Sequence, residues 1–115
     1  MTIQHLHPGP RMSRGVVHGD VVYLSGLVAE DTALDVKGQT TQILAAIDAL
    51  LAEAGTDKSK LLKANIWLTD ITTWAQMNEV WDAWVVPGQT PARATVEAKL
   101  AGPGYKVEIM VEAAR

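Results

Sequence analysis

The chain has 115 residues, a length typical of one domain, and 48% of them are hydrophobic, which is enough for a core. The formal net charge is −3, and the Lys and Arg residues are scattered singly, which argues against nucleic acid as a primary partner. Cysteine is absent, which excludes a disulfide framework, a thiolate nucleophile and Cys-ligated zinc. No secretory signal and no apolar run of about 20 residues is present, so we expect a cytoplasmic protein with no membrane partner.

The first third of the sequence predicts strands followed by a loop. Residues 1–13 are polar, contain two prolines, and predict an extended N-terminal segment. The apolar runs 15–18 and 21–26 flank Gly19-Asp20, a pair typical of a tight hairpin turn. Residues 27–36 are acidic and without periodicity, and we expect them to be irregular.

A helix is predicted over residues 37–54. Its apolar residues recur at intervals of three and four positions. Gly55 follows as a glycine suited to the left-handed conformation that ends a helix. A polar turn, residues 56–60, then leads into a strand over 61–69. One face of that strand is wholly apolar, and the other mixes polar residues with an aromatic ring that favours association between subunits; this second face carries Lys63, Asn65, Trp67 and Thr69.

A second helix is predicted after Asp70. Thr73 and Gln76 have the spacing of a capping box, and Pro87-Gly88 ends the pattern. Three of the four tryptophans lie in this helix at helical spacing, which is more typical of a core or subunit contact than of a cofactor site. The predicted apolar stripe is Trp74, Met77, Trp81 and Trp84.

Two further strands are predicted near 92–100 and 105–113. The whole chain, residues 1–115, is therefore expected to form a single α+β domain, in which right-handed crossovers place both helices on one face of one sheet. The apolar rows of all strands would face those helices. The second face, which carries Arg93 and Glu108, would face water or pack against copies of the chain.

Arg93 and Glu108 are the candidate functional residues. Each lies in a strand pattern opposite the apolar row, because side chains alternate faces along a strand. A guanidinium fork fits a carboxylate, and a carboxylate orients or deprotonates water, so the pair suggests a site for a small anionic substrate. The alternative is a surface salt bridge or two solvated charges.

Simple strand pairing does not bring these two charges together. If the last two strands formed a hairpin with a symmetric four-residue loop, Arg93 and Glu108 would share a face about four positions apart, roughly 13 Å. That separation is too large for one small molecule. Either the strands are not direct partners or the site is assembled between subunits, and we favour assembly between subunits.

The sequence resembles the RidA/YjgF family over nearly its whole length. No single motif decides this, but six stand in the family's order at suitable spacing. They are Val21–Gly26, the helix from Gln39 through Gln42 to Glu53-Ala-Gly55, Leu68–Asp70, Met77-Asn78, Pro91–Arg93 and Val107–Ile109.

The resemblance implies a chorismate-mutase-like α+β fold and a homotrimer, in which the sheets form an inner barrel with clefts between neighbouring subunits. In that fold the strand at 61–69 lies between the last two strands. Characterised members hydrolyse reactive enamines and imines to 2-oxo acids and ammonia, which suggests a cytoplasmic hydrolase that removes reactive intermediates without a cofactor. The implied partner is a small carboxylate substrate.

The family pattern assigns roles residue by residue. Arg93 matches the arginine that holds the substrate carboxylate, and Glu108 matches the glutamate near the attacking water. Ser25 and Gly26 match a segment that lines the cleft, and Asn78 matches an asparagine often found there.

Three positions depart from the family pattern and alter the pocket walls. Met12 stands where many active members have tyrosine, Thr95 where others have cysteine, and Leu27 where a glutamine is common. Ser13, Arg14 or Ser25 could supply the missing polar contact. Arg14 could also be a second anion contact, although a solvated arginine beside a strand start is the more common case.

Other activities have weaker support in the sequence. His5 and His7 form a His-x-His pair, but no carboxylate or cysteine stands nearby at ligand spacing, so no metal site is predicted. The alternative to an enzyme is a non-catalytic trimer that binds small carboxylates or regulates a partner, which the Met12 departure favours. Ribonuclease or translation-inhibition activity, attached to some relatives, is disfavoured by the acidic balance.

Overall fold

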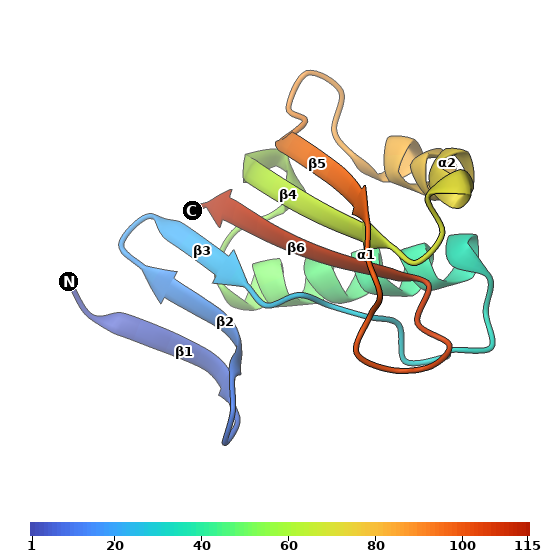
Figure 1. The fold of residues 1–115 in the computed structure, drawn as a ribbon. Coiled ribbons are helices and arrows are strands. Elements are labelled where there is room, and N and C mark those ends of the chain that lie inside the picture. The colour runs from blue at the N-terminus through green and yellow to red at the C-terminus, as the bar shows by residue number, and fades with distance from the viewer.

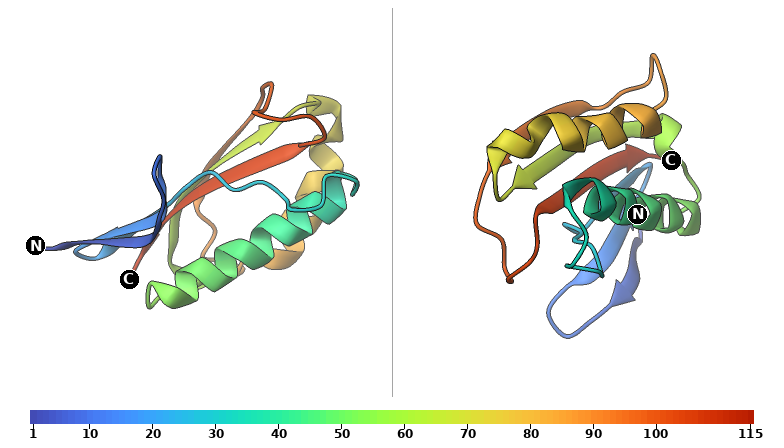
Figure 2. Two further views of the ribbon diagram at one scale, coloured as in Figure 1. Left: turned by 90° about the horizontal axis from the view of Figure 1, so that it is seen from below. Right: turned by 90° about the vertical axis from the view of Figure 1, so that its right-hand side faces the viewer.

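The computed structural model describes residues 1–115 and has one mixed six-stranded sheet with two helices on one face (Figures 1 and 2). Sheet order is β1-β2-β3-β6-β4-β5. The strands are β1 (Ile3–Pro8), β2 (Ser13–His18), β3 (Val21–Leu24), β4 (Leu61–Leu68), β5 (Ala92–Glu97) and β6 (Val107–Ala114). The helices are α1 (Val36–Glu53) and α2 (Trp74–Trp84), with short 3-10 turns η1 (Lys58–Lys60) and η2 (Ile71–Thr73).

Most elements lie where the sequence predicts them. The N-terminal segment is extended as expected, but it is also hydrogen-bonded to β2 as an edge strand. Gly19 takes the left-handed φ of 60° at the turn between β2 and β3, and Gly55 takes a φ of 82° after α1. Strand β4 lies between β5 and β6, pairing parallel to β5 and antiparallel to β6, as the family resemblance implies.

The core lies between the sheet and the two helices. Alternate residues of β4 and β6 point toward the helices, and Ile66, Leu68 and Ile109 are fully buried there. From α1 the apolar stripe predicted by its periodicity supplies Ile43, Ile47 and Leu51. The opposite face of the sheet is uncovered, and it is the face turned toward the viewer in Figure 1.

The start of α2 differs from the sequence prediction. The hydroxyl of Thr73 makes no capping bond to the helix, so the predicted capping box is absent. Thr73 instead donates to the carbonyl of Asp70, whose carboxylate caps the preceding 3-10 turn at Thr72 N. Trp74, the first residue of α2, is 50% exposed instead of joining the buried stripe of Met77 and Trp81.

Buried Gln39 ties the loop before β6 to helix α1. Its amide nitrogen donates to the carbonyls of Leu34 and Gly104 at 3.0 and 2.9 Å, and its amide oxygen accepts from Lys106 N at 2.9 Å. A buried side-chain amide is stable only with its partners in place. These bonds therefore fix where β6 begins, and with it the position of Glu108.

Candidate functional site

Arg93 is anchored at the edge of the sheet by helix α2. Its Nη1 donates to Oδ1 of Asn78 at 2.7 Å, and its guanidinium carbon lies 5.4 Å from the centre of the Trp81 ring. Burial lowers the pKa of Arg93, and the carboxylate of Asp82 partly offsets this effect. The contact with Asn78 is the one hydrogen bond that the guanidinium makes, so the rest of its fork is available to an anion.

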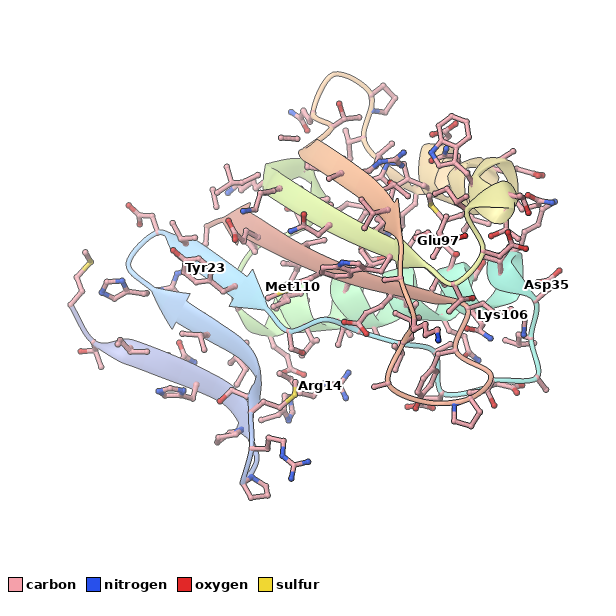
Figure 3. The ribbon with its side chains drawn as sticks, in the orientation of Figure 1. Arg14, Tyr23, Asp35, Glu97, Lys106 and Met110 are labelled. Carbon is pink, nitrogen blue, oxygen red and sulfur yellow. The ribbon has the colours of Figure 1, made fainter.

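The face of β5 that carries Arg93 was predicted wrongly. Arg93 is paired with Ala64 and Thr95 with Ile66, so both point toward the helix side of the sheet. The apolar row of β5 lies on the uncovered face, where Val96 is 49% exposed. Alternation shows which residues share a side of a strand but not which side is the core. Here both faces carry apolar residues, because the uncovered face also presents Tyr23 and Met110 (Figure 3).

Glu108 lies on the uncovered face, in β6, with Trp67 as its partner across β4. Its carboxylate rests directly on Gly26, and a β-carbon at that position would overlap Oε2. Burial raises the pKa of Glu108, and no cation of its own chain opposes that effect. A half-buried carboxylate of this kind is suited to exchanging a proton with a water molecule.

The segment over Glu108 is held by backbone hydrogen bonds. Leu27 N donates to Ile109 O at 2.9 Å, and Ile109 N donates to Leu27 O at 3.1 Å. On the other side, Ser25 N donates to Arg14 O at 2.9 Å. The hydroxyl of Ser25 is buried and makes no hydrogen bond within the chain. A buried hydroxyl without a partner is uncommon, and it marks this segment as a candidate binding surface.

A hollow of about 560 Å³ opens beside this segment. Met12, Gly26 and Leu27, three of the residues predicted to contact substrate, line it together with part of α1. The hollow lies between the β1–β2 hairpin, the chain that follows β3, and helix α1. Its full lining is Met12, Arg14, Gly26, Leu27, Val28, Glu30, Gln42, Ala45 and Ala46.

The predicted residues thus fall into two groups within one chain. Arg93, Asn78 and Thr95 lie near α2 on the helix side, and the hydroxyl of Thr95 is buried without a hydrogen-bond partner. Glu108 and the residues of the hollow form the other group. Arg93 and Glu108 are on opposite faces of the sheet and in different rows of it, so a salt bridge between them is excluded.

Trp81 was not predicted as a site residue, whereas Arg14 was considered as a second anion contact beside the more common case of a solvated side chain. Trp81 follows Asn78 by three positions and therefore shares its face of α2, a spacing that could have identified it. Arg14 is exposed, as the favoured alternative predicts, but it also lines the hollow, and its place there depends on the twist of the β1–β2 hairpin. Periodicity alone does not reveal that twist.

The two N-terminal histidines contact different side chains. Nε2 of His7 is 2.7 Å from a carboxylate oxygen of Glu53, while His5 lies 3.4 Å from the hydroxyl of Ser13. No cluster of three or more His, Cys, Asp or Glu residues has the geometry to hold a metal ion. Neither helix has the length and apolar character that crossing a membrane requires.

Comparison with known proteins places this geometry in a family. The family model described as Endoribonuclease L-PSP matches residues 2–115. The chain is 46% identical over 112 residues to a RutC family protein of Haemophilus influenzae, covering 96% of this chain and 97% of that protein. It is also 46% identical over 114 residues to RutC family protein YoaB of Escherichia coli, covering 99% of both.

Solved structures of the YjgF family have the same fold as this chain. A member of the YjgF protein family from Neisseria meningitidis superposes with a TM-score of 0.97 at 46% identity, covering 100% of this chain and 96% of that one. The chain belongs to the RidA/YjgF family. A more distant relative from Mycobacterium tuberculosis, described as a YjgF/YER057c/UK114 family member, superposes with a TM-score of 0.90 at 26% identity and covers 99% of this chain. The RidA/YjgF fold, predicted from six motifs, is therefore confirmed.

Proposed function

We propose that this chain hydrolyses reactive imines and enamines of small carboxylic acids to 2-oxo acids and ammonia. The observation that carries the proposal is a pair of complementary unpaired charges. Arg93 is anchored through one nitrogen by Asn78 and offers the rest of its fork, while Glu108 has a raised pKa and no cation of its own chain near it. The first is suited to a substrate carboxylate and the second to water.

The two groups meet only if neighbouring chains assemble. Tyr23, Val96 and Met110 expose large apolar side chains on the uncovered sheet face, 42%, 49% and 39% of each respectively. An apolar face of this kind marks an interface, and the family resemblance implies a homotrimer. We propose that each active site takes Arg93 from one subunit and Glu108 from its neighbour.

In this mechanism the imine carbon is already electrophilic, so no covalent nucleophile is needed. Arg93 binds the substrate carboxylate and fixes the imine carbon over Glu108. Water attacks that carbon while Glu108 accepts a water proton, and the C=N electron pair moves to nitrogen. Glu108 then returns the proton to nitrogen, which gives the neutral carbinolamine. Glu108 next accepts the hydroxyl proton and passes it to the amino nitrogen, the C–N bond breaks with its electron pair leaving on ammonia, and the O–H pair forms the carbonyl of the 2-oxo acid. An enamine enters the same route after tautomerising to the imine.

A trapping assay tests the proposal. A pyridoxal-phosphate dehydratase acting on serine supplies 2-aminoacrylate, and semicarbazide traps the imine that escapes hydrolysis. The protein should lower the yield of trapped imine and raise the rate of pyruvate release. An unchanged yield at micromolar protein, with the fold intact, would refute imine hydrolysis.

The second candidate is a trimer that binds small carboxylates without turnover. Met12 favours it, because this residue lines the hollow where many active relatives carry a tyrosine, and a thioether offers no proton. Calorimetric binding of pyruvate, with no effect in the trapping assay, would support this candidate. Met12→Tyr then provides a check, since restored turnover would identify the missing hydroxyl as the cause.

A further inference from the structure

The hollow beside Glu108 is larger than the smallest imines need. At about 560 Å³ it falls in the range of pockets that hold drug-sized ligands, whereas 2-iminopropanoate has only a methyl side chain. One of its lining residues is Gly26, on which the Glu108 carboxylate rests. A substrate whose reacting carbon lies over Glu108 would therefore extend its side chain into this space.

Arg14 is the one cation among the residues that line the hollow. Its backbone carbonyl accepts the hydrogen bond from Ser25 N, which places Arg14 one strand away from the Ser25-Gly26 segment. Its side chain is exposed and takes part in none of the ion pairs or hydrogen bonds of the chain, and Figure 3 shows it projecting from β2 beneath this segment. A guanidinium without a partner is free to bind an anion.

Glu30 is the one carboxylate among the residues that line the hollow. It stands four residues after Gly26. Gln42, the amide on the facing helix, already accepts a hydrogen bond from Asp31 N. Of the two charged residues, Arg14 is the one whose strand is hydrogen-bonded to the Ser25-Gly26 segment, so we take the cation as the partner of a substrate side chain that passes Gly26.

We propose that the hollow binds a second carboxylate, and that the preferred ligands are dicarboxylic 2-imino acids and the corresponding 2-oxo dicarboxylic acids. This inference rests on the proposed function for the placement of the reacting carbon. The α-carboxylate binds Arg93 of the neighbouring subunit, and the distal carboxylate binds Arg14. Adjacent strands lie about 5 Å apart, a gap that a side chain of one or two methylene groups bridges. Such a substrate is supplied by oxidation of an acidic amino acid.

Binding of stable product analogues tests the ligand class without requiring turnover. Titration calorimetry compares 2-oxoglutarate with 2-oxopentanoate, which has the same chain length and lacks the distal carboxylate. The wild-type protein should bind 2-oxoglutarate about tenfold or more tightly than 2-oxopentanoate, as a hydrogen-bonded charge pair predicts. Arg14→Gln should remove most of this difference. Equal affinities, or no binding of either acid, would overturn the inference.

Two matched variants make the test specific. Arg11→Gln removes a nearby exposed cation that does not line the hollow, so the preference for 2-oxoglutarate should persist. Glu30→Gln removes the opposite charge and should not reduce the preference. If Arg11→Gln abolishes the preference as fully as Arg14→Gln does, the effect comes from net charge and the site assignment is wrong.

A turnover experiment separates this inference from the proposed function. Flavin amino acid oxidases generate the imines of alanine, aspartate and lysine in situ, and semicarbazide traps what remains. The aspartate-derived imine should have the highest kcat/KM, and Arg14→Gln should lower that value more than the value for the alanine-derived imine. A preference for the lysine-derived imine would overturn the inference. If no imine is hydrolysed while 2-oxoglutarate still binds through Arg14, the proposed function fails and the ligand class stands.

Discussion

Arg93 and Glu108 project from opposite faces of the same sheet. The Cα of Arg93 pairs with Ala64, whose side chain is buried beneath the helices, while Glu108 pairs with Trp67 on the uncovered face. Within one chain no small molecule can contact both. The proposed chemistry therefore depends on a neighbouring subunit. Substitutions at Arg93 should affect carboxylate binding, and substitutions at Glu108 should affect the attack of water.

Replacing Arg93 should remove the carboxylate clamp. Arg93→Ala should lower kcat/KM for 2-aminoacrylate clearance by about a hundredfold or more, because a charged, forked hydrogen bond is lost. Arg93→Lys keeps the charge but not the fork, and should recover only part of the rate. Circular dichroism and thermal melting check that both variants fold. Clearance at the parental rate by Arg93→Ala would show that the carboxylate binds elsewhere.

Asn78 should act as a positioning residue for Arg93. Its Oδ1 accepts from Nη1 at 2.7 Å, so Asn78→Ala frees the guanidinium without removing it. We expect KM to rise about tenfold with a smaller change in kcat, and Asn78→Asp, which keeps an acceptor, to restore much of the loss. Gln76→Ala, an exposed substitution on the same helix, is the control. Equal effects of Asn78→Ala and Gln76→Ala would contradict the assignment.

The fold was largely predictable because local patterns specify most of it. The repeat containing Ile43, Ile47 and Leu50 locates α1, and Gly55 ends it with a left-handed φ. The start of α2 was not predictable in the same way, because Asp70 competes with Thr73 for the capping role. The pairing of the N-terminal strand with β2 depends on tertiary contacts through Leu6, which is nearly fully buried.

Glu108→Gln should separate catalysis from stability. Loss of the general base should lower kcat by about 10²- to 10⁴-fold. The variant should also melt at a higher temperature than the parent. Burial raises the pKa of Glu108 in the folded state, so its ionised form is less stable there than in the unfolded chain at neutral pH. A lower melting temperature for Glu108→Gln would show that the ionised carboxylate stabilises the fold.

The dependence of kcat/KM on pH should follow the ionisation of Glu108. Because the active form of Glu108 is ionised and its pKa is raised above 4.5, kcat/KM should fall on acidification with a midpoint above that value. Uncatalysed imine hydrolysis must be subtracted at each pH. Glu112→Gln removes a neighbouring carboxylate that pairs with Lys63, and should leave the midpoint in place. A midpoint at or below 4.5 in the parent protein would contradict the role of Glu108.

Gly26→Ala should inactivate the protein by displacing Glu108. A β-carbon at residue 26 would overlap the carboxylate, which must then rotate away from its water-directing position. We expect kcat to fall about a hundredfold or more while the fold remains intact. The double variant Gly26→Ala/Glu108→Gln should be no slower than Glu108→Gln alone, because the glycine acts through the glutamate. Additive losses would mean that Gly26 has a separate role.

The site was predictable in its residue types but not in its geometry. Arg93 and Glu108 stand out in the strand pattern, the family resemblance adds Asn78, and the structure places Asn78 against Arg93. The face of β5 was predicted wrongly because the uncovered side of the sheet is itself apolar, at Val96 and Met110. A pattern of alternate residues cannot distinguish a core from an intersubunit surface. The pattern could not decide between a solvated Arg14 and an anion contact for a related reason, since the place of Arg14 in the hollow depends on the twist of a hairpin.

The most direct test of the shared site is activity from mixed oligomers of two inactive variants. Arg93→Ala and Glu108→Gln chains are unfolded together in equal amounts, refolded, and assayed for 2-aminoacrylate clearance beside each variant refolded alone. If each site takes Arg93 from one subunit and Glu108 from its neighbour, random mixing restores both groups in about a quarter of the sites, and about a quarter of the parental activity should return. If the mixture is as inactive as its two components, although mass spectrometry shows that mixed oligomers have formed, the two residues do not act across a subunit boundary.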